Sequence, residues 1–550
     1  MAQNGEKIPP NNDNSSKTSH YSKVIIVGAG MAGLSAGFHL TKNNFTDFKI
    51  LEARGRLGGR IVQIPMGNEK VELGANWIHG VLGNPVYEFA MQHGLVDFLA
   101  APKPHKVVAA TEQGKQVPFS ILQEIYEAYL CFLKRCEEYF ISQYEPPDGI
   151  DSVGEHIKLE INLYLDKVKD TTERHLKELL FDCLLKRETC ISGCDSMNEI
   201  DLLEVGSYTE LQGGNIILPK GYSSILHPLE SVIPKENLYR RHPVKLIKWN
   251  CNKKHSKSPA ADACNDSDSD DSDRTVVEDS NSNPSCSRES SEERTVPSSY
   301  NVEIVCENNE RFYADHVICT IPLGVLKHKA NSLFKPLLPD YKMEAIERLL
   351  FGTVDKIILE YERPFLHPSI TEVLLLWEED ASEDISKNWY RKIYSFSKIT
   401  ETLILGWISG KEAEYMETLD NNLLIETCTM ILRKFLNDPF IPKPKSCVCT
   451  TWHNQQYTRG SYTAVAVGSS QIDIECLAQP LYLDENETKP VLLFAGEHTH
   501  SNFYSTVHGA YLTGRTAAQI ILHSDTPQEI VVDCQDETDL SSWIQGITLE

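Results

Sequence analysis

A glycine-rich turn between an apolar strand and a helix, close to the start of the chain, restricts the possible fold more than any other feature. The β-branched run Val24–Val27 is followed by GAGMAG at 28–33 and by an apolar, helix-like stretch at 34–40. A second strand-like segment, FKILEAR, places Glu52 24 residues after the first glycine of the turn. In such units the glycines permit a tight turn, close approach of a pyrophosphate, and close helix–strand packing, and the acid suits a ribose diol. The pattern predicts an α/β fold with a Rossmann-like dinucleotide-binding unit.

Directly after Glu52, the sequence ARGRLGGR forms a second element rich in glycine and arginine. The helix after the first loop already points its N-terminus at phosphates. A second phosphate-facing loop beside it suits a permanently bound flavin dinucleotide better than an exchanging NAD. The two elements therefore favour FAD over NAD, and the expected contacts come from Gly28, Ala29, Gly30, Met31, Ala32, Gly33, Glu52, Ala53, Arg54, Gly59 and Arg60.

The charge and the cysteine content limit the class of protein. The 550-residue chain has a formal net charge of −25, which repels nucleic acids and anionic membranes and attracts cationic small molecules. Its 15 cysteines follow no disulfide framework, which indicates a reducing compartment. The N-terminal residues are polar, no apolar run reaches ~18 residues, and Thr548, Leu549 and Glu550 are not a peroxisomal signal. We therefore expect a cytoplasmic protein, or a nuclear one, without nucleic acid or membrane partners.

Beyond the nucleotide unit the sequence pattern changes twice. Residues 119–142 and 152–187 carry apolar side chains at helical spacing, so a helical region is predicted there. Residues 251–300 are rich in serine and aspartate, with 11 acidic residues and 2 arginines between Asp262 and Glu293. This composition predicts a disordered acidic insert. The sequence HTH at 498–500 lacks further ligands at suitable spacing, so no metal site is predicted.

The stretch GTVDKIILEY at 352–361 places a lysine inside a predicted strand. Strand alternation puts Lys356 on the same face as Val354, Ile358 and Glu360. From these residues alone two interpretations stay open. Lys356 is either a solvated lysine on an edge strand or a lysine placed against a ligand.

Several separated blocks of sequence resemble one protein family. The blocks are GAGMAGL at 28–34, LEARGRLGGR at 51–60, ELGANWIHG at 72–80, GTVDKIILEYERPF at 352–365, RGSYT at 459–463 and FAGEHTHSNFYSTVHGAYLTGR at 494–515. Together they resemble the flavin amine oxidase superfamily over residues 22–525, apart from the acidic insert. Within it they resemble the polyamine oxidase branch of spermine oxidases and N1-acetylpolyamine oxidases.

The resemblance implies an α/β FAD-binding domain assembled from separated segments, plus an α+β substrate-binding domain. The family geometry puts the flavin ring at their interface, where a ligand cavity is expected. Residues 1–21 are expected to form a disordered leader and residues 526–550 an acidic tail. The implied FAD-binding segments are 22–98, 212–332 and 446–525, and the substrate-domain segments are 99–211 and 333–445.

The resemblance also implies roles for individual residues. Lys356 matches a lysine that holds a water near flavin N5, and His79 matches a cavity histidine that positions or deprotonates the amine. Glu210 matches an acid that can hold a protonated amine in spermine oxidases. Taken alone, His79 could be a packed core histidine, and Glu210 a surface glutamate. The further implied contacts are Tyr462, Tyr504 and Thr506 with substrate, and Gly74, Ala75, Asn76, Trp77, Val244, Gly496, Glu497, Thr506 and Val507 with FAD.

The predicted function is that of an FAD-dependent polyamine oxidase acting on spermine and O2, as a monomer or weak dimer. Hydride leaves the carbon beside a secondary amine for flavin N5, the imine is hydrolysed to spermidine and 3-aminopropanal, and oxygen is reduced to hydrogen peroxide. Ser461 stands where monoamine oxidases carry a flavin-linked cysteine, so noncovalent FAD is expected. The alternatives are an oxidase of N1-acetylpolyamines, amino acids or methyl-lysine, a catalytically silent flavoprotein scaffold, and an NAD-dependent dehydrogenase.

Overall fold

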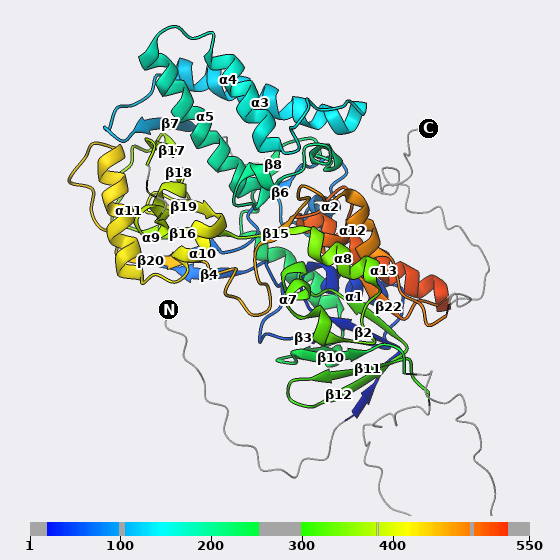
Figure 1. Cartoon of the computed structure of the whole chain (residues 1–550). Coiled ribbons are helices and arrows are strands. Elements are labelled where there is room, and N and C mark those ends of the chain that lie inside the picture. The colour runs from blue at the N-terminus through cyan, green and yellow to red at the C-terminus, as the bar shows by residue number, and fades with distance from the viewer. Residues whose placement is uncertain are drawn as a thin grey trace, which may run out of the picture.

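A computed structural model describes residues 19–97, 105–251, 299–380, 382, 384–484 and 489–525. Figure 1 shows two bodies side by side, one with a parallel sheet and the other with a larger sheet below three long helices. The chain passes between the two bodies several times, because strands from distant parts of the sequence meet in each sheet. Within the residues described, no helix has both the length and the apolar character that crossing a membrane requires.

The first body is built on a five-stranded parallel sheet with the order β22–β13–β2–β3–β9. Every residue of its central strand β2 is buried, with Val24 and Ile26 in one apolar cluster and Ile25 and Val27 in another, so both faces of the strand are covered. The sheet combines three widely separated parts of the chain. Its strands are β2 (Val24–Val27), β3 (Phe48–Glu52), β9 (Leu238–Arg240), β13 (His316–Cys319) and β22 (Leu492–Phe494).

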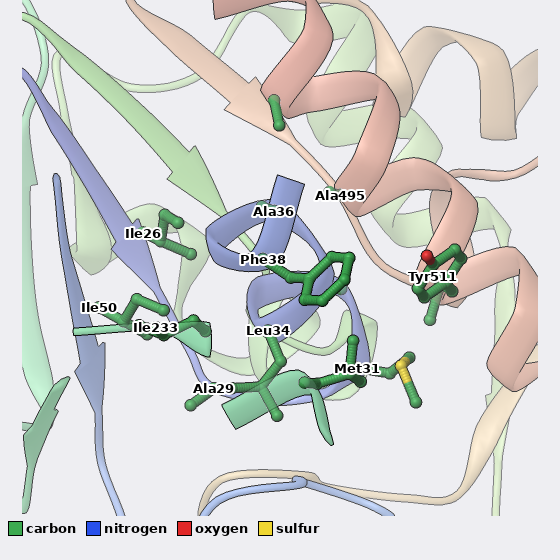
Figure 2. Close-up of a cluster of buried hydrophobic side chains, with 14 of the residues drawn as sticks. Ile26, Ala29, Met31, Leu34, Ala36, Phe38, Ile50, Ile233, Ala495 and Tyr511 are labelled. Atoms are coloured by element: carbon green, nitrogen blue, oxygen red, sulfur yellow. The ribbon is translucent and has the colours of Figure 1, made fainter. Parts of the chain in front are cut away.

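Two helices from opposite ends of the chain, α1 (Met31–Lys42) and α13 (Val507–Asp525), pack against each other beside this sheet. Phe38 of α1, Ile26 of β2 and Tyr511 of α13 belong to one buried apolar cluster (Figure 2). The glycine-rich turn before α1 is therefore held by contacts to both the first and the last described segments.

A second, mixed sheet has the order β1–β12–β11–β10–β14. The expectation that residues 1–21 form a disordered leader is wrong for 19–21, because β1 pairs in parallel with β12 through its backbone. Its polar side chains gave no apolar pattern that could predict this. Residues 1–18, most of the acidic insert (252–298) and the tail 526–550 lie outside the described residues. The strands are β1 (Ser19–Tyr21), β10 (Val244–Lys248), β11 (Val302–Cys306), β12 (Arg311–Ala314) and β14 (Phe334–Lys335).

The second body contains a six-stranded sheet with the order β20–β16–β19–β18–β17–β7. Strand β16, which carries Lys356, lies between β20 and β19 and is buried at every residue, so the solvated-edge interpretation of Lys356 is wrong. Strand β20, which the predicted division gives to the third FAD-binding segment, pairs with β16 in this sheet. The strands are β7 (Lys106–Thr111), β16 (Val354–Glu360), β17 (Ile370–Leu376), β18 (Ser395–Lys398), β19 (Leu403–Ser409) and β20 (Ser446–Cys449).

Long helices cover this sheet, and the predicted helical region is confirmed. Helices α3 (Phe119–Ser142), α4 (Val153–Leu165) and α5 (Thr171–Ser192) pack together and share a core cluster with the sheet, while α11 (Asn421–Phe435) covers another part of it. A capping box of Ser152 and Glu155 starts α4.

The remaining helices and strands are shorter. They are β4 (Gln63–Met66), β5 (Glu69–Glu72), β6 (Ile78–His79), α2 (Pro85–Gln92), β8 (Asn215–Ile216), α6 (Leu226–Val232), α7 (Leu323–Leu333), α8 (Asp340–Arg348), β15 (Leu350–Gly352), α9 (Ile385–Asn388), α10 (Gly410–Met416), β21 (Tyr462–Ala464) and α12 (Gln471–Ala478).

Candidate active site

A cavity of about 1180 Å³ runs from the glycine-rich loop of the first body to helices α3 and α5 of the second. All the site residues predicted from the sequence line it except Ala29 and Gly33. Ala29 contributes a backbone N–H to Glu52, and Gly33 packs closely against the backbone of Gly28. The lining residues are Gly28, Gly30, Met31, Ala32, Glu52, Ala53, Arg54, Gly59, Arg60, Gly74, Ala75, Asn76, Trp77, His79, Glu210, Val244, Lys356, Tyr462, Gly496, Glu497, Tyr504, Thr506 and Val507.

The three glycines of the first loop each have the environment that dinucleotide binding requires. Gly28 has φ +104°, and a Cβ there would lie 2.5 Å from Thr320 Oγ1. A Cβ at Gly33 would lie 2.0 Å from the carbonyl oxygen of Gly28, so only glycine allows this packing. No atom lies within 4 Å of a Cβ at Gly30, which leaves an open cradle beside the backbone at the helix N-terminus.

Glu52, at the end of β3, joins the two loops. Its Oε2 accepts a 2.9 Å hydrogen bond from the backbone N–H of Ala29, and its Oε1 accepts one of 2.7 Å from that of Arg54. The carboxylate is buried and lines the cavity, next to where the first loop opens. Its position fixes the second loop relative to the first.

A second buried acid, Glu497, organises the C-terminal part of the cavity. Arg60 Nη1 lies 2.9 Å from its Oε1, and the backbone N–H of Ser505 donates to its Oε2 at 2.9 Å. Burial opposes the charge of Glu497, but Arg60, His498 and Thr463 together outweigh it and lower the pKa of this carboxyl below its usual value. Thr506 Oγ1 accepts from the N–H of Gly509 at 2.9 Å, so Thr506 caps α13.

Lys356 reaches the cavity from β16, and only 3% of the residue's surface is exposed. Its Nζ donates to the carbonyl oxygens of Glu72 at 2.9 Å and Gly74 at 2.6 Å, and to Asn76 Oδ1 at 3.0 Å. Burial lowers the pKa of Lys356 to about 7, although the charge of Glu72 acts in the opposite direction. The lysine therefore holds the 72–76 backbone and can exist as a neutral amine near neutral pH.

His79 also faces the cavity, and it is not a packed core histidine. Its Nδ1 lies 3.2 Å from Oδ1 of Asn215, the residue directly opposite it in the β6–β8 pair. Burial lowers the pKa of His79, while Asn215 and the charge of Glu210 raise it. The imidazole is thus oriented by a cross-strand partner, which the sequence reasoning missed.

Three carboxyl groups converge on the part of the cavity formed by the helices: the predicted Glu210, together with Glu137 of α3 and Glu188 of α5. Burial raises the pKa of Glu188 to about 7, and burial together with Glu210 raises that of Glu137. Within the described part of the chain, none of the three carboxylates accepts a protein hydrogen bond. Glu137 and Glu210 are exposed to the cavity and Glu188 is half-buried, so a ligand in the cavity can reach all three.

The two helical acids could have been found from the sequence. On α3, Glu137 stands four residues from both Leu133 and Ile141, and these three side chains line the cavity. On α5, Glu188 has the same relation to Leu184, with Ile191 three residues on. An acid within the apolar stripe of an amphipathic helix is the signal that was overlooked.

Aromatic rings form much of the remaining wall. The predicted Tyr462 donates its hydroxyl to the carbonyl oxygen of Cys190, and Tyr504 lies edge-on to Tyr208, with 5.6 Å between ring centroids. Trp77 stacks on Trp407 at 5.9 Å. Tyr208, Trp407 and Trp452 also line the cavity and were not predicted. In the part of the chain that the structure covers, no group of three or more His, Cys, Asp or Glu side chains could hold a metal ion.

Comparison with known proteins identifies the family. The model of the family "Flavin containing amine oxidoreductase" matches residues 31–277 and 292–522. The chain belongs to this family. It is therefore an FAD-dependent amine oxidase, as the paired loops predict, and the NAD-dependent dehydrogenase is excluded.

Several relatives match this amine oxidase over most of their length. The peroxisomal N(1)-acetyl-spermine/spermidine oxidase of Homo sapiens is 34% identical over 92% of this chain and 96% of its own, and that of Bos taurus is 32% identical over the same shares. The probable polyamine oxidase 5 of Arabidopsis thaliana is 28% identical over 91% of this chain and 98% of its own. Both mammalian enzymes are named as peroxisomal, which contradicts the cytoplasmic location expected from the sequence.

A solved structure has the same fold as this amine oxidase. A double mutant of putrescine oxidase, redesigned for cofactor binding, superposes with a TM-score of 0.61 and 15% identity, covering 92% of this chain and all of the other. The expected α/β architecture is thereby confirmed.

The residues of this amine oxidase fit FAD. The open cradle at Gly30 and the carboxylate of Glu52 suit a diphosphate and a ribose, and the segment 74–77 suits a flavin ring beside Lys356. The cavity exceeds the roughly 300–1,000 Å³ of ordinary ligand pockets. It therefore has room for a dinucleotide and a substrate together.

Proposed function

We propose that this enzyme oxidises polyamines, with free spermine as its substrate. The observation that carries the proposal is the set of three cavity carboxyls, Glu137, Glu188 and Glu210, which have no protein partners within the described residues. A polyamine is a chain of ammonium groups separated by methylenes, so it needs acids spaced along an otherwise apolar passage. The apolar stripes of α3 and α5 supply the surface between the acids. The names of the relatives also support a polyamine.

His79 would prepare the amine. With Asn215 Oδ1 as acceptor, Nδ1 of the imidazole carries the hydrogen and Nε2 presents its lone pair. Because burial favours the neutral ring, Nε2 can accept the proton that the reacting ammonium must lose. The carboxylate of Glu210 then stabilises the imidazolium that forms.

Lys356 would act at the flavin. Noncovalently bound FAD supplies the hydride acceptor and is reoxidised by oxygen, which yields hydrogen peroxide. As a neutral amine, Lys356 has two hydrogens for three acceptors, so one of the three positions around Nζ carries the lone pair, which can take a proton. Hydrolysis of the imine would release spermidine and 3-aminopropanal.

An N1-acetylated polyamine is a second candidate, which one feature of the cavity favours. Arg187 lines the cavity beside Glu188, with its guanidinium over the ring of Tyr126, 5.8 Å from the centroid. Its N–H groups can donate to the carbonyl oxygen of an acetamide, which no carboxylate can do. The human and bovine relatives are named for acetylated substrates.

A peroxide-release assay with spermine, spermidine and N1-acetylspermine separates the two candidates. The proposal expects kcat/KM for spermine to be at least ~10-fold above that for N1-acetylspermine, because an acetylated end has no charge for Glu210 or Glu188. The reverse order would transfer the proposal to the acetylated substrate. A protein with full FAD content that releases no peroxide with any of the three would refute both.

The role of the acids is tested by Glu188→Gln. We expect KM for spermine to rise by about tenfold with little change in kcat, because an ammonium loses one charged partner. Glu178→Gln, an exposed change on the same helix, is the matched control and should leave KM unchanged.

A further inference from the structure

Asp355 precedes Lys356 on β16, so its side chain points to the opposite face of the strand, away from the cavity. The residue is 0% exposed. Its Oδ1 accepts a hydrogen bond from Thr450 Oγ1 at 2.6 Å and another from the backbone N–H of Trp452 at 3.2 Å. A buried carboxyl on a central strand is unfavourable unless it makes such bonds, so its partners indicate what it is for.

The partners of Asp355 lead to Lys356 by two routes. Thr450 Oγ1 accepts from the backbone N–H of Lys356 at 2.8 Å, and the N–H of Thr450 donates to the carbonyl oxygen of Lys356 at 3.0 Å. The indole Nε1 of Trp452 donates to the carbonyl oxygen of Leu73 at 3.3 Å. Leu73 lies between Glu72 and Gly74, the two residues whose carbonyl oxygens receive Nζ of Lys356.

We propose that Asp355 is a positioning residue, which holds the 450–452 segment so that the Lys356 side chain and the 72–74 backbone keep one fixed geometry. The hydrogen bonds form a closed frame: Asp355 to Trp452, Trp452 to Leu73, and the neighbours of Leu73 to Lys356. A rigid second layer of this kind limits how far a reacting group can drift from its target. The inference rests on the proposed role of Lys356 at the flavin.

The surroundings of Asp355 also indicate its protonation state. Burial and the nearby carboxylate of Glu417 raise the pKa of Asp355 well above its usual value. Glu417 is itself held by the backbone N–H groups of His453 at 2.8 Å and Asn454 at 2.9 Å. The other titratable groups near Asp355 are Cys449 and Tyr462, whose own pKa values are raised, so both are neutral. The raised pKa favours the protonated carboxyl, and Oδ2 has no hydrogen-bond partner among the described residues, so asparagine can replace Asp355 with its amide oxygen as the acceptor for Thr450 and Trp452.

The experiment compares Asp355→Ala, Asp355→Asn and Trp452→Phe in the FAD-loaded enzyme. Two quantities are measured: the rate of flavin reduction by spermine without oxygen, as a function of pH, and the hydrogen exchange of the amides in 70–77. For Asp355→Ala we expect reduction at least ~10-fold slower, a rising pH limb moved above 7 because water relieves the burial of Lys356, and faster exchange in 70–77. Trp452→Phe should change the reduction rate, the pH limb and the amide exchange in the same directions, but by smaller amounts.

Asp355→Asn is the rescue control. It should reduce the flavin within ~3-fold of the parent enzyme, with unchanged exchange in 70–77. The inference is overturned if Asp355→Ala matches the parent in rate and exchange, or if Asp355→Asn is as impaired as Asp355→Ala. If Asp355→Ala does not fold, Trp452→Phe decides, and parent-like behaviour there overturns the frame. If no polyamine reduces the flavin of the parent enzyme, the proposed function is refuted. The exchange data would still test the hydrogen-bonded frame in that case.

Discussion

Two lysines, Lys356 in the second body and Lys342 of α8 near the first, are buried to a similar degree, with 3% and 0% of the residue exposed. Burial lowers the pKa of each to about 7. Each Nζ donates to two backbone carbonyl oxygens, and each lies over an aromatic ring: Trp407 at 5.0 Å for Lys356, and Phe494 at 4.8 Å for Lys342.

The difference between the two lysines lies in what surrounds them. Lys342 bonds the carbonyl oxygens of Cys476 and Leu477, in the last turn of α12, and lies in a closed core. It satisfies helix-end acceptors, as basic side chains commonly do. Lys356 bonds a backbone segment that lines the cavity. A perturbed pKa alone therefore does not identify a functional group, and contact with the cavity has to be added.

The largest expected difference is in turnover. Lys356→Met should retain FAD but lower the rate of flavin reduction or reoxidation by about 10²-fold, within the range for loss of a proton-transfer group. Lys342→Met should stay within ~3-fold of the parent. Stopped-flow reduction and reoxidation with spermine measure both. Equal losses in the two variants would mean that the cavity contact does not distinguish them.

The pH dependence of stability should be alike for both. A lysine with a folded pKa near 7 and an unfolded value near 10.5 binds fewer protons when folded, so stability rises with pH between these values. Relative to the parent, Lys342→Met should thus gain about 2.7 kcal/mol more at pH 6 than at pH 9. Urea unfolding at both pH values checks the sign. A gain that is larger at pH 9 would mean that Lys342 is not buried as a neutral amine.

Glu72 separates the two sites electrostatically, since its charge raises the pKa of Lys356 and it is not among the causes of the Lys342 shift. Glu72→Gln keeps an acceptor for Ser223 and removes this charge. We expect the rising limb of flavin reduction to move to lower pH by up to ~1 unit. If the rising limb of the pH profile does not move, the limb reports the titration of a group other than Lys356.

The smallest effect concerns the aromatic neighbours. Trp407→Phe weakens a cation–π contact worth about 1 kcal/mol, so flavin reduction should change by only a few-fold, with its pH limb slightly lower. Phe494→Leu is the counterpart at Lys342, and it should lower stability by about 1 kcal/mol without moving the limb. If Phe494→Leu moves the pH limb of flavin reduction, the conclusion that only Lys356 acts in the cavity would be wrong.

Local patterns predicted much of this molecule, and distant contacts explain the rest. The roles of Gly28, Gly30 and Gly33 could be inferred because strand, turn and helix are adjacent in sequence. Lys342 gave no signal, because α8 is polar and the carbonyls of α12 that receive it come from a distant segment. Strand β1 was missed for the same reason, since only its pairing with β12 makes it a strand.

The order of strands around β2 has a consequence for synthesis. As the chain leaves the ribosome, the apolar strand Val24–Val27 and its neighbour β3 emerge long before β13, the other partner of β2, and β22 and α13 follow later. Until then one edge of β2 has no neighbour, and an unpaired apolar strand invites aggregation. The parallel sheet therefore cannot be completed until β13 and β22 have been made, and the nascent chain has to be protected while the edge of β2 is free.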